Sequence, residues 1–216
     1  MSTRTSATTR ALLRCGAAAG PLFLGVATVE GATRPGYDPL RHPISSLAIG
    51  PRGWRQVANF AASGALVLAG ASGLARTRTL PRTVPALLAA VGAGLAGAGA
   101  FRTDPISGYP PGSPPAPDPA TTAGRLHDVA STPVFLCLPA AAATTAVSAL
   151  RPGERGWAAA SGAAAAAHFA AFVAAGGGFA QRPRLVRWGG LFQRLSLAAG
   201  LGWFAALCTR AIGSAR

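Results

Sequence analysis

Four side chains that could bind a metal ion or transfer a proton occur in three separate stretches of the chain. His42 lies in the segment RHPISS, Asp104 lies in FRTDPIS, and His127 and Asp128 are adjacent in GRLHD. Two imidazoles and two carboxylates can hold a zinc ion, which activates a bound water. Their spacing matches no compact metal motif, so this catalytic and zinc-binding hypothesis requires the fold to bring the four residues together.

Further polar residues near these stretches are candidates for substrate binding. A guanidinium group from Arg102 or Arg194 could hold an anionic group such as the phosphate of a lipid headgroup. A serine of the first stretch could instead be a nucleophile beside His42 or His127. The candidate substrate-binding residues are Arg102, Arg194, Gln193, Ser45, Ser46 and Asn59.

A purely structural interpretation of the same residues is also available. Asp104 and Asp128 would then form ion pairs with arginines that fasten the loops, and the histidines would donate to backbone carbonyls. The arginines available for this are Arg102, Arg125 and Arg194. His168 lies within an apolar stretch, where we expect a neutral imidazole bonded to a neighbouring Ser or Thr.

The elements that must position these residues are six apolar segments. The chain has 216 residues, of which 12% are charged, compared with about 25% in soluble domains. A membrane-spanning helix needs about 20 apolar residues. We therefore predict an all-α, polytopic bundle of six transmembrane helices in one domain, residues 11–212, after a short cytoplasmic tail, residues 1–10. The first helix is expected to be retained, although it resembles a signal peptide. The predicted spans are 11–29, 54–75, 83–101, 126–149, 157–179 and 190–212.

The connections between these spans alternate in character. Residues 31–53 and 102–125 form long loops rich in Pro and Gly, and both contain a Pro-Ile-Ser sequence, whereas the connection at 76–82 is short and holds three arginines. In a six-span chain, the long loops and the starts of the second, fourth and sixth spans share one face. Because basic short loops favour the cytoplasm, we expect both termini in the cytoplasm and the polar cluster outside.

Charge and small residues narrow the possibilities further. The formal net charge is +14, and all 20 basic residues are arginines scattered between apolar stretches. A nucleic-acid-binding surface would gather them on one face, so we expect no nucleic-acid partner. Small residues at four-residue spacing, such as Gly16 and Gly20 or Gly92 and Ala96, predict closely packed helices.

Several strings of the chain resemble a known family. They are RHPISSLAIGPRGWRQVANF, FRTDPISGYPPGSP, GRLHD and LFQRLS, in this order and between apolar segments. Together they resemble the bacterial membrane family named domain of unknown function 998, over roughly residues 35 to 205. The resemblance implies an integral membrane protein of the bacterial cell membrane, with several helices and no assigned activity, so no catalytic residue is transferred from it.

These observations leave three functional classes. The first is a non-enzymatic bundle in the lipid bilayer that is structural or binds a partner, a lipid or an anionic small molecule. The second is an outward-facing hydrolase, dependent on a metal or a serine, that acts on a lipid or envelope substrate. The third is a small transporter, which would need polar sites near the middle of the membrane. The first class is favoured, and no cofactor is identified apart from the hypothetical zinc ion.

Overall fold

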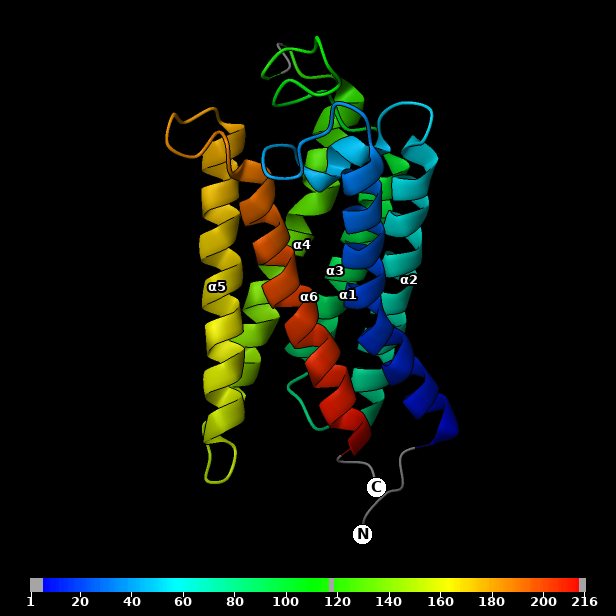
Figure 1. Ribbon diagram of the computed structural model, residues 1–216. Coiled ribbons are helices and arrows are strands. Elements are labelled where there is room, and N and C mark those ends of the chain that lie inside the picture. Colours follow the sequence, from blue (N-terminus) through cyan, green and yellow to red (C-terminus); the bar gives the residue numbers. More distant parts are fainter. Residues whose placement is uncertain (1–5, 117–118, 214–216) are drawn as a thin grey trace.

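Six long helices make up the computed structural model, which describes residues 6–116 and 119–213 (Figure 1). A short 3-10 helix, η1, lies in the first long loop, and no strand occurs in the two described ranges. The elements are α1 (Ala7–Thr33), η1 (Ile44–Ala48), α2 (Gly53–Thr77), α3 (Thr83–Ala100), α4 (Thr122–Ser148), α5 (Arg155–Phe179) and α6 (Gly189–Gly213).

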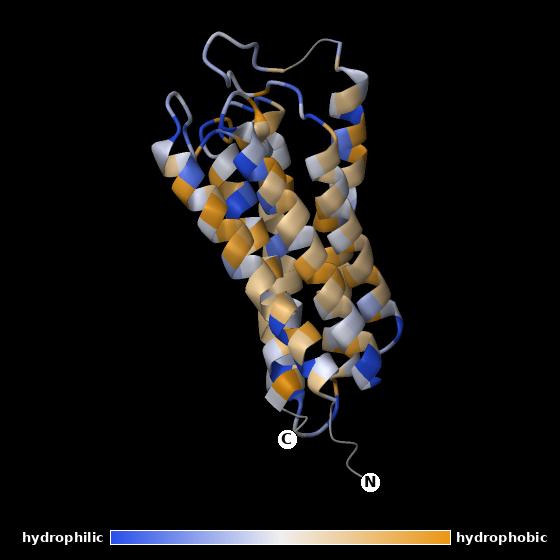
Figure 2. Ribbon diagram, turned by 90° about the vertical axis from the view of Figure 1, so that its right-hand side faces the viewer, coloured by the Kyte–Doolittle hydropathy of each residue, from blue (hydrophilic) through white to orange (hydrophobic). Residues whose placement is uncertain are grey.

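All six helices are long and apolar enough to cross a membrane, which confirms the predicted bundle. Apolar residues dominate the middle of the molecule and polar residues gather mainly at its two ends (Figure 2). Two helices begin four residues earlier than predicted because a hydroxyl caps each of them. The Ser6 side chain accepts a hydrogen bond from the Thr9 amide, and the Thr121 side chain accepts one from Gly124, which satisfies N-terminal amides that have no partner within the helix.

The helices form a closed ring in chain order. Each packs against its neighbours in the sequence, and α1 also packs against α6, which makes smaller contacts with α4 and α2. The chain termini lie at one end of the bundle, and both long loops lie at the other end, together with the starts of α2, α4 and α6 (Figure 1). The predicted common face for the polar segments is therefore confirmed.

Glycines allow the helices to approach closely, as the small-residue spacing predicted. A Cβ atom added to Gly16 would come within 2.7 Å of the Gly70 Cα atom, and one added to Gly64 would come equally close to the Gly92 carbonyl oxygen. A Cβ atom on Gly94 would meet the Ala130 carbonyl oxygen at 2.8 Å. Close backbone contact at glycines therefore contributes to the packing of the first four helices.

We expect Gly70→Ala to lower the stability of the protein by about 1 to 3 kcal/mol, because the added methyl group overpacks the contact with α1 and Phe204. Gly202→Ala is the matched control, since a Cβ atom there meets nothing within 4 Å. The control should be neutral or stabilising by up to about 1 kcal/mol. Thermal unfolding in detergent measures both variants, and equal unfolding temperatures would contradict the close packing.

Candidate functional site

A cavity of about 350 Å³ lies beneath the two long loops. It is surrounded by the halves of the helices that are nearest to those loops. It receives Pro43, Ile44 and Ser45 from the first loop and Ile106 from the second. Both Pro-Ile-Ser sequences thus contribute to one site, although they are 62 residues apart in the chain. The side walls come mainly from α4, α5 and α6.

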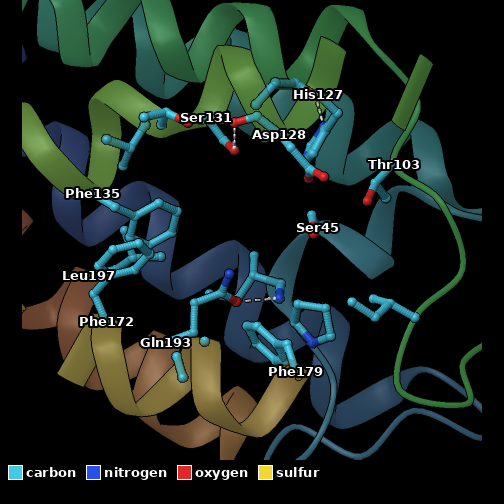
Figure 3. A pocket seen from close by; sticks show the side chains of 18 of the residues that line it. Ser45, Thr103, His127, Asp128, Ser131, Phe135, Phe172, Phe179, Gln193 and Leu197 are labelled. Atoms are coloured by element: carbon cyan, nitrogen blue, oxygen red, sulfur yellow. Dashed lines mark hydrogen bonds between the residues drawn. The ribbon is translucent and has the colours of Figure 1, made fainter. Parts of the chain in front are cut away.

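Polar groups gather at one end of this cavity. The Asp128 carboxylate points into it, facing the hydroxyls of Ser45 and Thr103 (Figure 3). Within the described part of the chain, the Asp128 carboxylate takes part in no hydrogen bond or ion pair. The hydroxyl of Ser131 donates to the backbone oxygen of Asp128 at 3.0 Å, not to its carboxylate. The carboxylate can therefore accept a hydrogen bond from a ligand.

Gln193 supplies a donor to the same cavity. Its Oε1 atom accepts a hydrogen bond from the Ile44 amide at 2.7 Å. This bond fixes the orientation of the side chain, and the amide nitrogen points into the cavity (Figure 3). The candidate binding role of Gln193 therefore has a suitable geometry, which depends on the position of η1.

Aromatic rings form the other end of the cavity. Phe135 of α4 and Phe172 of α5 stack with their centroids 4.8 Å apart and their planes at 15°. Leu197 extends this apolar wall, whereas Phe179, the last residue of α5, lies beside Gln193 (Figure 3). The cavity therefore changes from polar to apolar along its length.

The cavity opens between α4 and α5. Among its lining residues, Asp128, Thr132 and Leu136 of α4 and Gly176 of α5 are exposed. Asp128 lies six residues after the start of α4, about 9 Å along the helix axis, and Phe135 lies about 10 Å deeper. Asp128 is therefore near the loop end of the bundle, and Phe135 lies nearer its middle.

Arg194 holds the first loop in place, and its anion-binding role stays a prediction. Its Nη1 atom donates to the carbonyl oxygens of Pro39 at 2.7 Å, His42 at 3.2 Å and Gly190 at 3.0 Å. Its Nη2 atom donates to the Tyr37 hydroxyl at 2.6 Å. These acceptors fix the guanidinium against the first loop, so it does not line the cavity.

The predicted ion pairs of the two aspartates are wrong. Asp104 accepts hydrogen bonds from the amide and the hydroxyl of Thr121, at 2.8 and 2.7 Å. It therefore holds the second loop at the start of α4, and a Cβ atom on Gly124 would collide with its carboxylate. None of the ion pairs that the described residues form includes Asp104 or Asp128.

The four residues suggested for zinc do not form a metal site. In the described part of the chain, no group of three His, Cys, Asp or Glu side chains could hold a metal ion. The Nδ1 atom of His42 accepts from the Asp38 amide at 2.9 Å, and its ring packs against Tyr37 and Tyr109, outside the cavity. The Nδ1 atom of His127 donates to the carbonyl oxygens of Ala98 and Phe101.

The remaining candidates lie apart from the polar end of the cavity. Ser46 is fully buried in η1, outside the cavity lining, and Arg102 is exposed. Asn59 is buried and donates to the Phe23 carbonyl oxygen at 3.0 Å. His168 is fully buried, but its Nδ1 atom bonds the backbone oxygen of Ser196 at 2.8 Å rather than a hydroxyl.

Sequence reasoning missed the aromatic end of the cavity and an ion-pair cluster outside it. The cluster joins Glu30, at the end of α1, to three arginines within 3.1 Å. The available signal in the sequence was Glu30, an isolated acidic residue at the end of an apolar span. Which arginines pair with it depends on the path of the first loop, which the sequence does not show. They are Arg34, Arg52 and Arg55.

A family model described as protein of unknown function (DUF998) matches residues 17–210, which include every residue that lines the cavity. The chain belongs to the DUF998 family. The resemblance found in the sequence is thereby confirmed, and the DUF998 domain covers all six helices at least in part. No curated protein and no solved structure matches the chain.

The loop that carries His42 should loosen in acid. Burial lowers the pKa of His42 below its ordinary value of 6.5, with Arg41 and Arg194 acting in the same direction and Asp38 opposing them. A lowered folded-state pKa means that stability is complete above about pH 6.5 and decreases as the pH falls toward that lowered pKa. The hydrogen-exchange protection factors of residues 34–52, which correct for the slower intrinsic exchange in acid, should be lower at pH 5 than at pH 8. His42→Asn keeps an acceptor for the Asp38 amide and should flatten the dependence, so an unchanged pH profile in this variant would contradict the role.

Proposed function

We propose that this integral membrane protein binds a small amphiphilic molecule, with the ligand's head at Asp128 and its apolar part among the phenylalanine rings. The observation that supports this most directly is the carboxylate of Asp128, which has no partner among the described residues and points into a cavity with an apolar far end. Asp128 is exposed near the loop end of α4, so its carboxylate is accessible to the head of a ligand.

The charge of the cavity favours a ligand head that donates hydrogen bonds, such as an amine. Asp104 and Asp128 line it, and no arginine is among its described lining residues, although the chain contains 20. Carboxylates accept hydrogen bonds and attract cations. An anionic ligand would need Arg194, whose guanidinium is engaged with the first loop.

The size and the opening favour a ligand with a single chain. The cavity volume, about 350 Å³, is near the lower limit of the range of roughly 300 to 1,000 Å³ for small-molecule sites. The exposed lining of α4 and α5 lets a longer chain extend into the bilayer. The ligand would therefore enter from the membrane with its head near the loop end of the bundle.

Binding accounts for the geometry better than hydrolysis or transport. Ser45 shares the cavity with His127, but among the hydrogen bonds of the described residues none joins the Ser45 hydroxyl to the His127 imidazole, whose Nδ1 atom donates to two backbone carbonyls. A serine hydrolase needs its base within hydrogen-bond reach of the nucleophile. The mid-membrane candidates for transport, Asn59 and His168, are bonded to backbone oxygens within the bundle.

We further infer that the protein lies in a bacterial cell membrane with both termini in the cytoplasm. The short connection between α2 and α3 supports this orientation because it carries basic residues and no acidic ones. A reporter active only in the cytoplasm should therefore be active when fused after Thr79 and inactive after Pro115. Activity at Pro115 combined with inactivity at Thr79 would reverse the orientation.

Asp128→Asn should weaken binding of dodecylamine by roughly tenfold to a hundredfold, because a hydrogen bond to a charged group contributes about 1.5 to 3 kcal/mol. The measurement is the rise in unfolding temperature with added ligand in lipid nanodiscs. Dodecanol, which has the same chain without the amine, should stabilise the wild type less. Phe172→Ala should reduce the effect of both compounds.

Asp38→Asn is the matched control, since Asp38 lies in the first loop outside the cavity lining. It should keep the preference of the wild type for dodecylamine. Equal effects of the amine and the alcohol on the wild type, or an unchanged preference in Asp128→Asn, would contradict the proposal. Cleavage of an added single-chain ester by the wild type but not by Ser45→Ala would identify a hydrolase instead.

A further inference from the structure

A second groove, of about 520 Å³, runs along the outer surface between α1 and α2. None of the α4, α5 and α6 residues that wall the cavity lines it. Its floor is apolar and formed by small or branched side chains, and at one end it reaches Glu30, Trp54 and Arg55. The apolar lining consists of Leu22, Gly25, Val26 and Val29 of α1 with Ala58 and Ala62 of α2.

The polar end of this groove carries excess positive charge. The carboxylate of Glu30 is bonded to Arg34 at 3.1 Å, Arg52 at 3.0 Å and Arg55 at 2.8 Å. One negative and three positive charges leave the cluster with a formal net charge of +2. The Glu30 side chain is only 5% exposed, whereas those of Arg52 and Arg55 are 35% and 45% exposed. The positive groups therefore face the outside.

Trp54 indicates the depth of this charge in the bilayer. Its side chain is among the most exposed large hydrophobic groups, and the guanidinium of Arg55 lies 5.6 Å from the centre of its ring. Tryptophan is enriched at the level of the headgroups. The two outward-facing arginines are thus placed where lipid phosphates lie, and the apolar floor extends from Val29 to Leu22, about 10 Å along α1.

We propose that this groove is a binding site for an anionic phospholipid. Its phosphate would contact Arg52 and Arg55, and one acyl chain would follow the groove between α1 and α2. The charge of the cluster selects an anionic over a zwitterionic headgroup, because each arginine near the surface attracts anionic lipid. A free phosphate would make no contact with the apolar floor of the groove. We therefore propose a lipid, and not a free phosphate, as the ligand.

Native mass spectrometry of the purified protein tests the site with an equimolar mixture of phosphatidylglycerol and phosphatidylcholine. The wild type should retain phosphatidylglycerol preferentially. Arg55→Gln removes one attraction and should reduce the retained phosphatidylglycerol about fivefold. Arg102→Gln is its matched control, because Arg102 is an exposed arginine at the same end of the bundle and outside both sites, and it should leave retention unchanged.

A steric pair of variants separates lipid binding from any loss of folding in Arg55→Gln. A Cβ atom on Gly25 meets nothing within 4 Å, and the same is true of Gly202 on α6. Gly25→Leu should fill the groove and reduce retention of phosphatidylglycerol at least as strongly as Arg55→Gln, whereas Gly202→Leu should not. Equal retention of the two lipids by the wild type, or equal retention by the two leucine variants, would overturn the proposal.

Discussion

The attachment of the first long loop to the start of α6 is the interaction on which the site depends. The amides of Gly190 and Leu191 donate to the backbone oxygens of Arg41 and Leu40, at 3.2 and 2.9 Å. N-terminal amides of a helix have no partner within it, and here the loop supplies their acceptors. A Cβ atom on Gly190 would come within 2.5 Å of the His42 carbonyl oxygen, so the contact requires glycine.

The neighbouring side chains of α6 extend this attachment into the cavity. Arg194 gathers three backbone oxygens and the Tyr37 hydroxyl, while Gln193 fixes the first residue of η1 through the Ile44 amide. The same bond directs the amide nitrogen of Gln193 into the cavity (Figure 3). The contacts with α6 that position the first loop therefore also help to place Ser45 opposite Asp128 (Figure 3).

The sequence was sufficient to predict the bundle but not the partners of its charged groups. In lipid, backbone groups must be satisfied within helices, so apolar length alone located all six spans, and alternation placed α2, α4 and α6 with their starts together. Partner choice depends on helix rotation and loop path, which hydropathy does not encode. Asp104 was expected to pair with an arginine, but the N-terminus of α4 lies closer and offers two donors from Thr121. Arg194 was expected to bind an anion, but carbonyl oxygens of the first loop surround it.

The distribution of charge connects the two proposed lipid sites. Arginine has a long side chain that can reach the headgroup level from within a membrane helix, so an unpaired aspartate in this basic chain would readily attract one. Four arginines near the loop end are held elsewhere: Arg194 by carbonyl oxygens, and Arg34, Arg52 and Arg55 by Glu30. These four guanidinium groups are therefore not paired with Asp128, whose carboxylate lies at the mouth of the cavity, and the Glu30 cluster leaves positive charge on the surface of α1 and α2. An acidic site at the cavity mouth is therefore separate from a basic site on the outer surface of α1 and α2.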